Sequence, residues 1–147
     1  MCTCSGPLAV ELPRSVEAPA MARGLVTQHL CGEHGQAAVA AARLLATELT
    51  TCAVLYGSLP IRLEMECVED RLRIAVTHST TAQDVDEVPV DEEGGLRSAL
   101  LDKLTRSWGV ERIPHGRRLW CVLPTEVLPT GRVPSQRTTA RAAHSRA

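Results

Sequence analysis

The fold is decided by residues 36–79, QAAVAAARLLATELTTCAVLYGSLPIRLEMECVEDRLRIAVTHS, in which the period of the apolar residues changes once. The Ala-rich first half has high intrinsic helix propensity, so it predicts a long helix that ends at Tyr56, before Gly57. Its apolar positions recur at helical spacing. The stripe that we expect to face the core includes Leu45, Leu49 and Cys52.

The second half of this stretch alternates between apolar and charged residues, which is the period of a half-buried strand. Ile61, Leu63 and Met65 form the first alternating set, and Leu72, Ile74 and Val76 form the second. Glu69-Asp70 separates the two runs. The sequence therefore predicts an antiparallel hairpin directly after the long helix.

The flanking segments complete the order of elements. Residues 8–12 predict a short strand, and a first helix is expected to begin with Ser15 as its N-cap. After the hairpin, a third helix is predicted over 95–107, followed by two closing strands over 108–113 and 117–123. Helices grouped on one face of a mostly antiparallel sheet make an α+β fold, so we expect a two-layer sandwich with three helices on one face.

The same patterns divide the chain into three parts. Residues 1–7 are expected to be a disordered N-terminus, and residues 8–124 one folded domain. A polar, acidic run over 79–93 predicts a long loop inside that domain. Residues 125–147 hold four Arg and one acid with almost nothing to bury, so they predict a disordered, mildly basic tail.

Composition excludes several classes of function. The formal net charge is −1, which gives no reason to expect direct nucleic-acid binding. No run of about 18 apolar residues predicts a membrane span, and residues 1–20 lack the pattern of a secretory signal. We therefore expect a cytoplasmic protein.

Six cysteines are scattered along the chain, which argues against a disulfide framework in the cytoplasm. Four of them are expected to be small, buried, apolar thiols: Cys31, Cys52, Cys67 and Cys121. A different class of function, a metal or redox sensor, would have to use Cys2, Cys4 and Cys52. Because no basic cluster stands beside these thiols in the sequence, we expect them to be unreactive.

Three strings add a resemblance to this pattern: Ala42-Arg43-Leu44-Leu45-Ala46-Thr47-Glu48-Leu49, Trp108-Gly109-Val110 and Gly116-Arg117-Arg118-Leu119-Trp120. Together with the order of elements, they resemble the standalone anti-sigma-factor serine kinases of the GHKL (histidine-kinase-like ATPase) superfamily. The resemblance covers residues 8–124. It implies a Bergerat-type ATP-binding fold for that domain.

The resemblance also assigns roles, and most of the residues needed for them are replaced. Glu48 matches the catalytic general base, but the magnesium-binding asparagine is Cys52, and the chain contains no Asn. A thiol is a poor ligand for Mg²⁺. His78 stands where an aspartate binds adenine, and the phosphate-binding turn is reduced to Gly94, Gly95 and Arg97. We therefore expect no resident cofactor or metal, and a pseudo-kinase.

Two functions follow from the resemblance. The first is a regulatory protein that binds a sigma factor or an anti-sigma antagonist by partner switching, with ATP binding and kinase activity lost or weak. Its partner-binding surface is expected around residues 15–56. A homodimer is compatible with this function. The second is an active serine kinase that uses ATP, with Glu48 as base and Mg²⁺ held by acidic loop residues, namely Asp84, Asp86 and Asp91.

Overall fold

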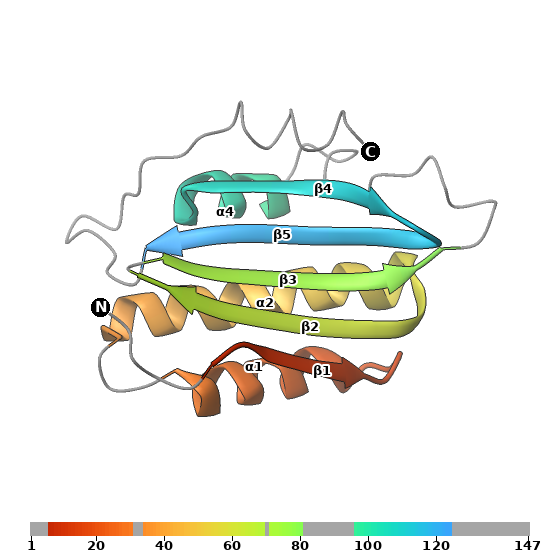
Figure 1. Ribbon diagram of the computed structural model, residues 1–147, viewed down its shortest axis with the longest axis horizontal. Coiled ribbons are helices and arrows are strands. Elements are labelled where there is room, and N and C mark those ends of the chain that lie inside the picture. The colour runs from red at the N-terminus through yellow and green to blue at the C-terminus, as the bar shows by residue number, and fades with distance from the viewer. Residues whose placement is uncertain (1–5, 31–33, 70, 81–95, 125–147) are drawn as a thin grey trace.

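The computed structural model describes residues 6–30, 34–69, 71–80 and 96–124 (Figure 1). Within these ranges one antiparallel sheet of five strands is covered on one face by three helices, which confirms the two-layer α+β sandwich. The elements are β1 (Leu8–Leu12), α1 (Ala18–His29), α2 (Gln36–Tyr56), β2 (Ser58–Val68), β3 (Arg71–Ser79), α4 (Leu96–Leu104), β4 (Ser107–Ile113) and β5 (Gly116–Pro124).

The strands lie in the order β1-β2-β3-β5-β4. The predicted hairpin is confirmed, since β2 and β3 pair through the turn at Glu69, which has a φ of 57°. A second hairpin joins β4 to β5 through Pro114 and His115. Strand β5 of this hairpin pairs with β3. Ser79, the last residue of β3, is opposite Gly116, the first residue of β5.

Helix α2 is the central core element, and its predicted bounds are confirmed. Leu45, Leu49 and Cys52 are all at most 1% exposed, as the helical stripe predicts. Arg23 of α1 reaches across to Thr47 of α2, with its Nη1 donating to Oγ1 at 3.4 Å. The core is therefore the apolar layer between these helices and the inner face of the sheet.

Two helix ends differ from the prediction. Helix α1 begins at Ala18 rather than directly after Ser15, because the Ser15 hydroxyl accepts a hydrogen bond from the backbone N–H of Glu17 and closes a turn first. Helix α4 ends at Leu104 rather than near Ser107. There the backbone N–H of Arg106 donates to Val122 of β5 at 2.7 Å, which turns the chain into the sheet.

Helix α2 is also long and apolar enough to cross a membrane by composition, with a mean hydropathy of 1.5 over its most apolar window. Half of that window is buried inside the domain. The core helix of a folded domain meets the same criterion, and the position of α2 against the sheet gives it that role.

Candidate functional site

The structure places the first two predicted site residues on α2. Glu48 and Cys52 lie one helical turn apart, and consequently on the same side of the helix. Glu48 is half-buried, whereas Cys52 is 0% exposed and belongs to the apolar core cluster. The position expected to hold a metal is therefore surrounded by core side chains, and its sulfur is a soft ligand that suits Mg²⁺ poorly.

His78, which stands at the expected purine-binding position, lies near the end of β3 and is 3% exposed. Its Nδ1 lies 2.9 Å from the carbonyl oxygen of Ser79. Because a carbonyl only accepts, Nδ1 carries a proton and donates it to this oxygen. The imidazole is thus held in one orientation by its own strand, inside the protein rather than at an open surface.

Two glycines enclose His78. A Cβ on Gly57, at the end of α2, would overlap Nδ1 and Cγ of the imidazole. A Cβ on Gly116 would overlap the carbonyl oxygen of His78. The prediction that α2 ends at Gly57 is confirmed, but its φ is −110°, so close packing rather than a left-handed backbone is what requires glycine here.

Sequence reasoning missed one charged residue of this cluster. Arg117 is opposite His78 in the pairing of β3 with β5, and it is only 3% exposed. Charged residues are rarely buried so completely unless they are paired, but nothing in the local sequence marks Arg117 as buried. The pairing of β5 with β3 is what brings it next to His78.

Glu48 and Cys52 lie in the second half of α2, and His78 of β3 packs at its end. At a rise of about 1.5 Å per residue, Cys52 lies roughly 7 Å along the helix axis from Gly57, and Glu48 roughly 13 Å. The imidazole of His78 packs at the Gly57 end. The fold therefore brings His78 to the same end of α2 as Cys52, with Glu48 further away.

The remaining predicted residues are only partly covered by the structure. Gly94 and Gly95 lie outside the described residues, as do Asp84, Asp86, Asp91, Cys2, Cys4 and Cys31. Arg97 lies in the first turn of α4, but its side chain is outside them too. Within the described ranges, no group of three or more His, Cys, Asp or Glu side chains is placed to hold a metal ion.

The described cysteines differ from one another. Cys52 and Cys121 are fully buried, as predicted, and burial raises the pKa of the Cys121 thiol to about 12. Cys67 departs from the prediction of a buried apolar thiol. It is half-buried, and its Sγ lies 3.5 Å from Nε2 of His34. A thiol beside an imidazole has a polar partner that the scattered spacing of the cysteines does not predict.

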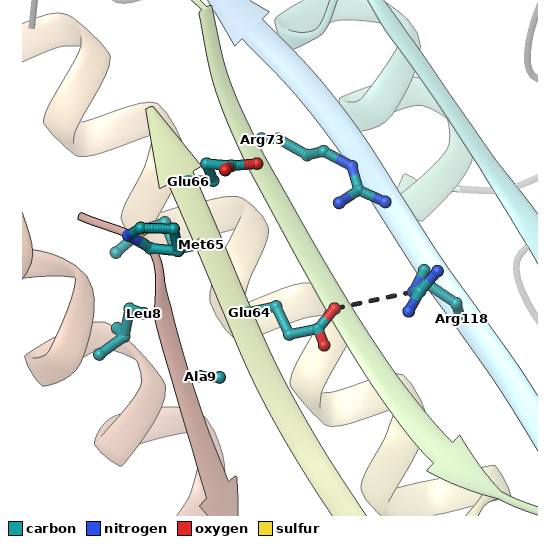
Figure 2. Close-up of a pocket in the computed structure, with 8 residues that line it drawn as sticks. Leu8, Ala9, Glu64, Met65, Glu66, Arg73 and Arg118 are labelled. Atoms are coloured by element: carbon teal, nitrogen blue, oxygen red, sulfur yellow. Dashed lines mark ion pairs between the residues drawn. The ribbon is translucent and has the colours of Figure 1, made fainter. Parts of the chain in front are cut away.

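A shallow hollow of about 270 Å³ lies over β1, β2, β3 and β5, and Figure 2 shows its lining. Arg118 crosses β3 toward Glu64, with Nε 3.7 Å from Oε1, and also reaches Glu111 at 3.1 Å. Glu66 and Arg73 face each other in the strand pairing. None of the predicted site residues lines this hollow, and its acids and bases balance, so it has no preference for an anionic nucleotide.

Neither a scan against protein-family models nor a search of curated proteins finds a match for this chain. The features that bear on function are therefore the chemistry of the residues around α2 and β3 and the resemblance of the sequence strings.

Proposed function

We propose that this protein is a regulatory, partner-binding relative of the anti-sigma serine kinases that has lost effective ATP binding. The order of its elements and its two-layer architecture are those that the resemblance implies. The observation that carries the proposal is the burial of Cys52 and His78 at the expected metal and purine positions. A cytoplasmic location and a sigma factor or anti-sigma antagonist as partner belong to the same proposal.

The free energy of nucleotide binding that the replaced residues would remove supports the proposed loss of ATP binding. A micromolar nucleotide site corresponds to about 8 kcal/mol. Removing a buried hydrogen-bond partner costs roughly 1–3 kcal/mol, and the magnesium ligand is lost in addition. Together these losses remove about 4 kcal/mol, which moves the affinity into the millimolar range. Without a held metal, the charge of the γ-phosphate is also poorly neutralised for transfer.

Titration calorimetry with Mg-ATP and Mg-ADP tests this loss. We expect dissociation constants of about 1 mM or weaker, and the same weak binding in the Glu48→Ala variant. In a transfer assay with radiolabelled ATP, we expect no label on a bound antagonist. Micromolar binding, or label transfer that disappears in Glu48→Ala, would instead establish the active kinase that uses the acidic loop residues.

Binding of a protein partner has its own test. Leu55 is 59% exposed on α2, inside the region expected to bind, whereas Val68 is 53% exposed at the far end of β2. We expect Leu55→Asp to weaken capture of a sigma factor or antagonist about tenfold, as loss of one apolar interface anchor does. Val68→Asp is the matched control and should leave capture unchanged, with or without ATP.

Two results would contradict the partner proposal. One is that none of the organism's sigma factors and anti-sigma antagonists is retained, whichever nucleotide is added. The other is an equal effect of the Leu55 and Val68 substitutions, because the surface around α1 and α2 would then have no special part in binding.

A further inference from the structure

A cysteine and a histidine that are far apart in the sequence meet near the start of α2. Cys67 is the next-to-last residue of β2, and His34 directly precedes Gly35, the N-cap of α2. Nε2 of His34 lies 3.5 Å from Sγ of Cys67, within hydrogen-bond range for sulfur. Cys67 lies outside residues 15–56, the region expected to bind a partner, and the pair is distinct from the Cys2, Cys4 and Cys52 set considered as a sensor.

The surroundings of the pair favour the thiolate form of Cys67. A neighbouring imidazole can take the thiol proton, and the ion pair that results is stabilised by charge. The first free backbone N–H groups of α2 begin just after Gly35, and this positive end of a 21-residue helix also favours a nearby anion. Thiols in such surroundings ionise at lower pH than a free cysteine does.

Access separates Cys67 from the other described thiols. Cys67 is half-buried and packs against the edge of the apolar core, whereas Cys52 and Cys121 are 0% exposed, so Cys67 is the most accessible of the three described thiols. His34 is 7% exposed, so its ring is held inside the protein against the thiol. The pair thus combines the most accessible described thiol with a buried imidazole at hydrogen-bond distance.

We propose that Cys67 is a reactive thiol, activated by His34, that small hydroperoxides oxidise to a sulfenic acid. The thiol proton passes to Nε2 of His34, and the thiolate attacks the terminal peroxide oxygen. The S–O bond forms as the O–O bond breaks, and the leaving oxygen takes the proton back from the imidazolium. The products are Cys67 sulfenic acid and water or an alcohol, so sulfur is oxidised and the peroxide is reduced.

The expected effect can be bounded. A free thiol is only a few per cent ionised at neutral pH. A thiolate whose pKa has been lowered is a somewhat weaker nucleophile than the thiolate of a free cysteine. Because this lower nucleophilicity offsets part of the gain in ionised fraction, activation should make folded Cys67 react about threefold faster than the same residue in the unfolded chain. If His34 merely filled space, burial would make the folded rate lower than the unfolded one.

The test treats the full chain with hydrogen peroxide and a sulfenic-acid trap, and follows each cysteine by peptide mass spectrometry. Trapping at Cys67 should exceed the unfolded-chain rate about threefold, with Cys52 and Cys121 unlabelled as internal controls. His34→Gln, which keeps a polar side chain but cannot accept the proton in the same way, should abolish the excess. A folded rate at or below the unfolded one, or an unchanged rate in His34→Gln, overturns the proposal.

A second measurement does not depend on whether His34→Gln folds. The ultraviolet absorbance of thiolate at neutral pH should fall by about half a thiolate per chain or more when Cys67 is replaced by Ser. Equal absorbance in the native protein and in Cys67→Ser would show that Cys67 is protonated and would overturn the proposal on its own.

Discussion

Replacing Gly116 with Ala is expected to lower the free energy of unfolding by about 3 kcal/mol or more. The new Cβ would overlap the carbonyl oxygen of His78, which belongs to the backbone of β3 and has no rotamer to change. The beginning of β5 would have to move away from β3. That movement breaks the pairing of Ser79 with Gly116 and strains the adjacent hydrogen bond from the N–H of Thr80 to the carbonyl of His115, 3.0 Å long.

Gly24→Ala is the matched control. Gly24 lies inside α1, and a Cβ there meets nothing within 4 Å. Alanine in an exposed helix interior is expected to stabilise the protein by roughly 0.5–1 kcal/mol, because glycine loses more backbone entropy on folding. Denaturant unfolding followed by circular dichroism measures both variants. Equal stabilities would mean that β3 and β5 do not approach each other as closely as the structure places them.

Gly116→Ala also has a consequence for the site. His78 is held by Gly116 through its backbone and by Gly57 through its ring, so moving β5 releases one side of the enclosure. Because the two strands then pack less closely, the variant should also exchange the amide hydrogens at the ends of β3 and β5 faster. Gly24→Ala should leave those amides unchanged.

The sequence patterns predicted α2 and the β2–β3 hairpin because both elements are long and strongly periodic. Residues 36–56 combine high helix propensity with a single apolar stripe, and the alternation after Gly57 admits only one register that buries Ile61, Leu63 and Met65. The start of α1 was missed because Ser15 closes a turn instead of capping the helix. A hydroxyl can do either, and the sequence alone does not decide between them.

The candidate site was harder to predict than the fold, for a physical reason. The helical periodicity predicts that Cys52 faces the core, whereas the resemblance places it where a metal ligand is expected. Cys52 is 0% exposed, as the periodicity predicts. The contacts of His78 with Gly116, and of His34 with Cys67, join segments that are distant in the chain. They arise from strand order and helix packing, which leave no local signal in the sequence.

Placing at position 52 the asparagine that the resembled family has there is not expected to create a nucleotide site. We expect Cys52→Asn to lower the free energy of unfolding by about 2–4 kcal/mol, because an amide at this 0% exposed position would have to bury two donors and an acceptor among core side chains. Cys52→Ala is the matched control. It removes only the sulfur, so it should cost about 1 kcal/mol.

Thermal unfolding with and without Mg-ATP gives the measurement. If the metal position is closed, Cys52→Asn should melt lower than Cys52→Ala, and neither should gain from nucleotide, since a ligand raises stability only when it binds the folded state. A variant with Asn at this position that is as stable as the native protein and is further stabilised by Mg-ATP would show that α2 still borders an accessible pocket. That outcome would contradict the proposal that this protein has no effective ATP site beside α2.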